Sequence, residues 1–148
     1  MAEQEEEIST LNDLIQTLKD GEEGFKQAAE AVESSNLKTL FTSYSQQRSR
    51  FATELQSRAK QLGESKPETE SSTAGAAHRA WINLKSVLTS GDHAILAECE
   101  RGEDSAVADY KDALENGLSS DVREMVSRQF SEIMAAHDKV KELRDASA

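Results

Sequence analysis

Apolar residues recur at spacings of three and four along four long segments of this chain, and no other feature constrains the fold as strongly. One side of an α-helix returns about every 3.6 residues, so each segment is expected to form a helix with one apolar face. The segments run from about residue 5 to 32, 37 to 62, 92 to 116 and 119 to 145. A single proline and many Ala, Glu, Leu, Lys, Gln and Ser residues favour helix throughout. The sequence therefore predicts an all-α protein.

Turn residues mark where these helices begin and end. Ser34-Ser35-Asn36 is a turn with capping side chains, and Gly63 is expected to end the second helix. Asp92, after Thr89-Ser90-Gly91, is expected to cap the helix that follows. Ser119-Ser120-Asp121 opens the last helix in the same way. The two outer connections are therefore short, and each joins its helices into an antiparallel hairpin.

The middle connection is long. We expect one domain over residues 1–148, with hairpins over 5–62 and 92–145 joined by a connection over 63–91. The connection contains a predicted helical segment from about 74 to 88 that carries Trp81, read as a packing anchor. It is long enough to run the length of a four-helix bundle, which lets the second and third helices point the same way. An up-down-up-down bundle with one long, kinked third helix is the alternative.

Two Gly-Glu dipeptides occupy matching places in the two hairpins. Gly21-Glu22 precedes Gln47 by 25 residues from the glutamate, and Gly102-Glu103 precedes Gln129 by 26. Both glutamates fall on the apolar stripe of one helix, and both glutamines fall on the stripe of the next. The repetition indicates a duplicated helical hairpin.

Counting from the turns places these four polar residues at similar depth. Each lies roughly eleven to fourteen residues from its turn, which at about 1.5 Å per residue is near the middle of the bundle. Arg48 shares the inward arc of the second helix, and Glu132 lies at the edge of the fourth. An unpaired buried carboxylate is costly. The sequence therefore predicts one central layer in which these groups meet, with Arg48 as a candidate partner of Glu22.

The arrangement resembles that of ferritin-like carboxylate proteins, in which two helices supply a Glu and the other two a Glu-x-x-His. The chain also resembles uncharacterised bacterial ferritin-like four-helix-bundle proteins, grouped as a domain of unknown function. This resemblance covers nearly the whole chain and is carried by the stretches Leu18–Phe25, His78–Lys85 and Gln129–Asp138. The resemblance implies a ferritin-like four-helix bundle with a long, partly helical connection between helices 2 and 3. It implies no activity.

The ligands of that family are altered here. Glu22 and Glu103 match its single glutamates, but Gln47-x-x-Arg50 and Gln129-x-x-Glu132 stand where Glu-x-x-His is expected. One interpretation is a divalent ion (Fe, Mn or Zn) held by the carboxylates and amides of Glu22, Gln47, Glu103, Gln129 and Glu132. The other is a mutually satisfied Glu–Gln–Arg layer that fixes helix register. We expect no catalytic residue and a structural or partner-binding protein, with metal binding or storage as the alternative.

Composition and charge limit the partners and the cellular compartment that we expect for this protein. A net charge of −11 disfavours nucleic acid and anionic lipid as partners. One cysteine, Cys99, excludes an internal disulfide and fits a reducing compartment. Neither a signal peptide nor an apolar run of about 20 residues is visible. The expectation is a cytoplasmic protein, off the membrane, that pairs with itself or with another protein.

Overall fold

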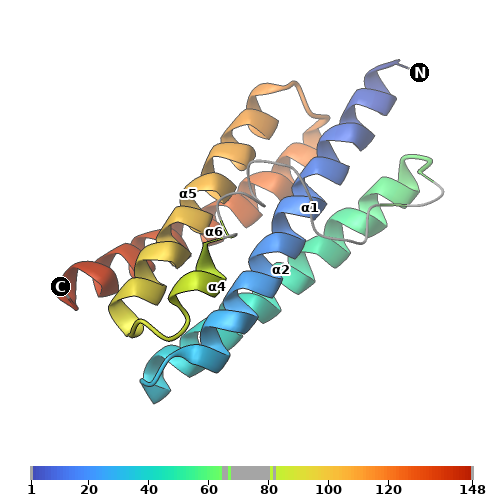
Figure 1. Ribbon diagram of the computed structural model, residues 1–148. Helices are drawn as coiled ribbons and strands as arrows, with labels where there is room; N and C mark the ends of the chain where they lie inside the picture. Colours follow the sequence, from blue (N-terminus) through green and yellow to red (C-terminus); the bar gives the residue numbers. More distant parts are fainter. Residues whose placement is uncertain (1, 65–66, 68–80, 82, 148) are drawn as a thin grey trace.

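The computed structural model of the protein describes residues 2–64, 67, 81 and 83–147 (Figure 1). This part of the chain contains helices and no strand, which confirms the all-α prediction. Four helices are long, and a fifth has a single turn. They are α1 (Ala2–Ala31), α2 (Ser35–Gln61), α4 (Leu84–Val87), α5 (Asp92–Glu115) and α6 (Ser120–Ala146). Of the helix expected over 74–88, the structure describes Trp81 and residues 83–88, among which Leu84–Val87 form α4; the remaining positions lie outside the described residues.

The ends of α2 follow the sequence signals. Ser34 is its N-cap and accepts a hydrogen bond from the backbone N–H of Leu37 at 3.3 Å. At the other end Gly63 has φ +112°, and its N–H donates to the carbonyl of Lys60. The next N–H, of Glu64, donates to the carbonyl of Ala59, which completes a Schellman motif.

The start of α5 differs from the prediction. Gly91 is the N-cap and no side chain caps the helix, so the assignment of Asp92 as the cap is wrong. The Asp92 carboxylate reaches instead to the turn between α1 and α2. It accepts hydrogen bonds from the backbone N–H groups of Glu33 at 2.8 Å and Ser34 at 3.0 Å. Asp92 therefore ties the beginning of α5 to the end of α1.

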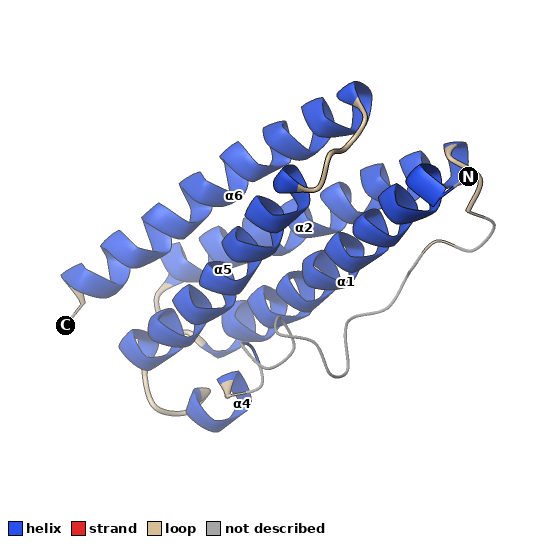
Figure 2. Cartoon of the chain, turned by 90° about the horizontal axis from the view of Figure 1, so that it is seen from above, coloured by secondary structure: helices blue, strands red, loops and turns tan. Residues whose placement is uncertain are grey.

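A matching contact at the opposite end fixes the helix directions. Glu7, near the start of α1, accepts hydrogen bonds from the N–H and hydroxyl of Ser119, just after α5. Because each end of α5 lies beside the opposite end of α1, the two helices are antiparallel. The short α1–α2 turn makes α2 antiparallel to α1 as well, so α2 and α5 point the same way (Figures 1 and 2). This is the direction that the long connection allows, and it differs from the up-down-up-down alternative.

The hydrophobic core is divided into two clusters along the helices. One cluster joins Leu11–Leu18 of α1 to the second halves of α2 and α5 and the first half of α6. The other joins Phe25–Val32 of α1 to the opposite halves of those helices and to Trp81 and Leu84. Arg48 and Glu103 are buried between the two clusters. Within the described residues, no helix has the 18-residue apolar stretch that a membrane-crossing segment needs.

Candidate functional site

The centre of the molecule holds a buried ion pair between Arg48 of α2 and Glu103 of α5. Arg48 Nη1 donates to Glu103 Oε1 at 2.5 Å, and Nη2 donates to Oε2 at 2.7 Å. The side chains are 1% and 0% exposed, so the pair is removed from water. A two-pronged contact of this kind is among the strongest charge-assisted hydrogen-bond geometries. Both carboxylate oxygens of Glu103 are therefore committed to the guanidinium.

Three neighbours complete the surroundings of Arg48. Gln47 Oε1 accepts a hydrogen bond from Arg48 Nε at 3.2 Å, so every nitrogen of the guanidinium is bonded. The Phe25 ring lies with its centre 5.3 Å from the guanidinium carbon, within cation–π range. Gly21 faces the same group, and a Cβ there would lie only 3.3 Å from Arg48 Nη1. We call Arg48, Gln47 and Glu103 the central polar layer.

The electrostatics of this layer favour a fixed ion pair over acid–base chemistry. Burial lowers the pKa of Arg48, but the charge and hydrogen bonds of Glu103, with further contributions from Tyr110 and Tyr44, raise it by more in sum, so the guanidinium stays charged. Burial raises the pKa of Tyr44, and the negative charge of Glu103 raises it further. The positive charge of Arg48 lowers it by a smaller amount. Burial is also the main cause of the pKa of Cys99 lying well above its usual range. A protonated, fully buried thiol is a poor nucleophile.

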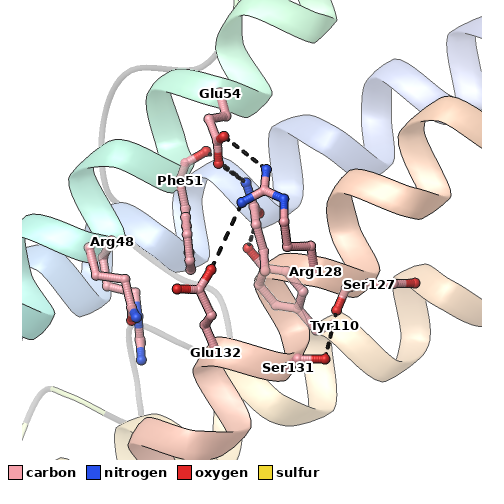
Figure 3. Close-up of polar contacts among 10 residues, drawn as sticks. Arg48, Phe51, Glu54, Tyr110, Ser127, Arg128, Ser131 and Glu132 are labelled. Carbon is pink, nitrogen blue, oxygen red and sulfur yellow. Dashed lines mark hydrogen bonds and ion pairs between the residues drawn. The ribbon is translucent and has the colours of Figure 1, made fainter.

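A second polar network surrounds Gln129 of α6, and Figure 3 labels three of the residues in it, Tyr110, Glu54 and Arg128. The Tyr110 hydroxyl donates to Gln129 Oε1 at 2.7 Å, and Gln129 Nε2 donates to Glu54 Oε1 at 3.0 Å. Arg128 then donates to the second oxygen of Glu54 at 2.9 Å. The network runs from a buried tyrosine on α5 through α6 to the surface of α2. The buried amide of Gln129 is thus satisfied by protein groups on both its oxygen and its nitrogen.

Tyr110→Phe is expected to lower the free energy of unfolding by about 1–3 kcal/mol, because it leaves the buried Gln129 oxygen without its donor. Burial raises the pKa of Tyr110 far above its usual value, so the hydroxyl remains a donor at all ordinary pH. Urea unfolding measures the loss. Tyr44→Phe removes the same atom from the half-buried tyrosine beside the other core cluster and is the matched control. Equal losses in the two variants would contradict the assigned role of the Tyr110–Gln129 bond.

The five residues proposed from sequence as one site are distributed over three environments. Glu103 and Gln129 are fully buried, and Gln47 is half-buried against Arg48. Glu22 lies at the edge of the bundle, 31% exposed, with Lys19 Nζ 3.0 Å from its carboxylate. Glu132 is 49% exposed and 3.9 Å from Arg128. The expectation that Arg48 pairs with Glu22 is wrong, because Arg48 pairs with Glu103.

This placement bears on whether the residues fit a carboxylate metal centre. Among the residues that the structure describes, no three His, Cys, Asp or Glu side chains are grouped so that they could hold a metal ion. The guanidinium of Arg48 stands against the one carboxylate that is fully buried in the central polar layer. A two-metal centre needs several carboxylates to balance at least four positive charges. The donor set in this arrangement does not fit such a centre.

Beside the central polar layer lies a slot that the sequence analysis did not identify. Trp81 sits between α1 and α5, where Gly24 and Gly102 face its indole ring. A Cβ built on either glycine would overlap the ring, and Phe25 meets the ring edge-on at 5.2 Å between centres. Trp81 is 9% exposed, which confirms its prediction as a packing anchor. The available signal was two glycines inside helices, where glycine costs about 1 kcal/mol relative to alanine.

A protein family matches the part of the chain that contains most of these residues. A family described as a domain of unknown function (DUF2383) matches residues 6–116. The chain belongs to this family. The matched residues include α2, α5, the Arg48–Glu103 pair and the Trp81 slot, whereas α6 lies beyond them. The family carries no assigned reaction, and no curated protein matches the chain.

Proposed function

We propose that this protein is a ferritin-like four-helix bundle with a structural or partner-binding role and no catalytic centre. The observation that carries the proposal is the Arg48–Glu103 pair at mid-bundle. In metal-binding bundles of this kind, inward carboxylates from four helices converge on metal ions. Here the positive charge that neutralises the buried carboxylate belongs to an arginine of the same chain. The layer then serves to hold α2 and α5 in one register.

The cost of separating the two buried charges supports this role. A buried ion pair adds little net stability over apolar residues of the same size, but it strongly disfavours any register in which one partner is left alone. Arg48 and Glu103 are 55 residues apart in sequence, and their helices lie on different hairpins. Sliding either hairpin would separate the two charges inside the core. The pair is thus suited to fixing how the hairpins meet.

The competing proposal is a divalent cation held by Glu22, Glu103 and Glu132, with the amides of Gln47 and Gln129. It requires Arg48 to leave Glu103 and requires Glu22 and Glu132 to turn inward from their partners Lys19 and Arg128. Each of these movements breaks an ion pair. The structural role requires none of them.

Metal analysis distinguishes the two proposals. Protein purified without an affinity tag is expected to contain no stoichiometric Fe, Mn or Zn, and anaerobic Fe(II) is expected to leave its thermal midpoint unchanged. The Glu22→Ala and Glu103→Ala variants are analysed in parallel. One bound metal ion per chain that disappears in both variants would overturn the structural proposal and establish the metal-binding one.

A further inference from the structure

His137 bridges α5 and α6 on the side of the bundle next to the central polar layer. Its Nε2 lies 2.6 Å from Oδ1 of Asp104 on α5, and its Nδ1 lies 3.1 Å from Oδ1 of Asp138 on α6. The histidine side chain is 17% exposed, whereas the two aspartates are 62% and 70% exposed. A single ring therefore has a carboxylate oxygen at each of its nitrogens.

The hydrogen-bond inventory of imidazole makes this arrangement depend on the proton. A neutral ring has one N–H and one lone pair, so it donates to only one of two carboxylates. The lone pair then faces the other carboxylate oxygen, which cannot donate when ionised. The imidazolium has two N–H groups and a positive charge, and it satisfies both aspartates together. The two carboxylate oxygens are therefore placed to suit the protonated ring better than the neutral one.

We propose that His137 is a pH-dependent link between helices: in its protonated form the ring holds α6 against α5 through Asp104, with Asp138 of α6 stabilising the charged ring, and the link weakens when the proton is lost. The charged groups that face the ring are Asp104 from α5 and Asp138 from α6 itself. Further along the same contact between the two helices, Arg144 pairs with Glu100 at 3.0 Å. The neighbouring cations are engaged elsewhere, Arg101 with Glu98, Lys139 with Glu142 and Lys141 with Asp145.

The direction of the pH dependence follows from the surroundings of the ring. Burial lowers the pKa of His137, but hydrogen bonds to Asp138 and Asp104 and their charges raise it by more, so its pKa lies above the usual value. A pKa raised by folding means that the folded state binds the proton more tightly than the unfolded chain. The stabilisation is complete below the unfolded value of about 6.5 and is lost as pH rises through the higher folded value.

The link acts on the one long helix that lies outside the family match of residues 6–116. Val140, one turn beyond His137, is fully buried in the second core cluster. Loss of the proton therefore weakens the attachment of the C-terminal half of α6, while Gln129 and Tyr110 still hold its first half. The inference concerns the movement of α6 and is independent of the proposed role of the central polar layer.

The test uses thermal unfolding of the full chain from about pH 5.5 to about pH 9, a range that spans histidine titration. Wild type is compared with His137→Gln, and the difference in midpoint is expected to be a few degrees at the acidic end and to shrink as pH rises. Glu142→Gln, an exposed change of charge on α6, is the control and should leave the pH profile parallel to wild type. A wild-type advantage over His137→Gln that is the same at every pH would overturn the proposed link.

A spectroscopic measurement separates the link from a general loss of packing. The ring protons of His137 are followed by NMR in wild type and in Asp104→Asn, which keeps the shape of the side chain but removes its charge. The titration midpoint of His137 is expected to move to lower pH in the variant, because its α5 partner no longer favours the imidazolium. An unchanged midpoint would show that Asp104 does not hold the proton and would overturn the proposal.

Discussion

Arg48→Met is expected to lower the free energy of unfolding by about 3–5 kcal/mol, because it leaves a buried carboxylate without its partner. Glu103 is 0% exposed, and both of its oxygens accept from Arg48, so no water replaces the lost donors without disrupting the core. For a chain of this size the loss corresponds to a fall of about 10 °C in the thermal midpoint. Chemical and thermal unfolding followed by circular dichroism measure it.

Two further variants show whether the loss of stability in Arg48→Met comes from breaking the Arg48–Glu103 ion pair. The double variant Arg48→Met/Glu103→Leu removes both charges and is expected to recover most of the stability, since an apolar replacement of a buried pair is often neutral. Glu22→Gln is the matched control on the other Gly-Glu dipeptide. Its surface pair with Lys19 predicts a change below about 1 kcal/mol. A double variant as unstable as the sum of its single changes, or a large loss in Glu22→Gln, would contradict the assignment.

The helices could be predicted from sequence because their signals are local. The apolar spacing within α1, α2, α5 and α6 depends on residues three and four positions apart, and the turn signals depend on a few neighbouring residues. The ends of these helices accordingly fall within a few residues of the expected ones. The direction of α5 relative to α2 depends on contacts such as Asp92 with Glu33, which join residues 59 apart in sequence. No local pattern specifies those contacts.

The central polar layer could be predicted only in part, because its members are brought together by contacts between helices and not by a local pattern. Periodicity placed both Glu22 and Glu103 on apolar stripes, but a stripe spans a wide arc of the helix. Which part of that arc is buried depends on the neighbouring helix. Glu103 faces Arg48 in the core, whereas Glu22 lies at the edge where Lys19, three residues earlier, reaches its carboxylate. The two Gly-Glu dipeptides are alike in sequence and different in environment, so the repeat alone could not distinguish them.

Trp81→Ala is expected to lower the free energy of unfolding by about 3–5 kcal/mol, because it empties the slot between Gly24 of α1 and Gly102 of α5. Trp81 is the only tryptophan in the chain, so intrinsic fluorescence reports its environment directly. Gly102→Ala tests the same slot from the opposite side. In an ordinary helix interior this change would add about 1 kcal/mol of stability. Here the new methyl group overlaps the indole ring, and the sign is expected to reverse.

Combining Gly102→Ala with Trp81→Ala shows whether contact with the indole ring causes the expected loss of stability. If the glycine exists to admit the ring, Gly102→Ala should destabilise the wild-type protein and shift Trp81 emission to longer wavelength as the ring is displaced toward water. In the Trp81→Ala background the methyl group has room, and the same substitution should be neutral or stabilising. A Gly102→Ala change that stabilises both backgrounds equally would mean that the ring yields without cost. The slot would then play no part in joining the connection to α1 and α5.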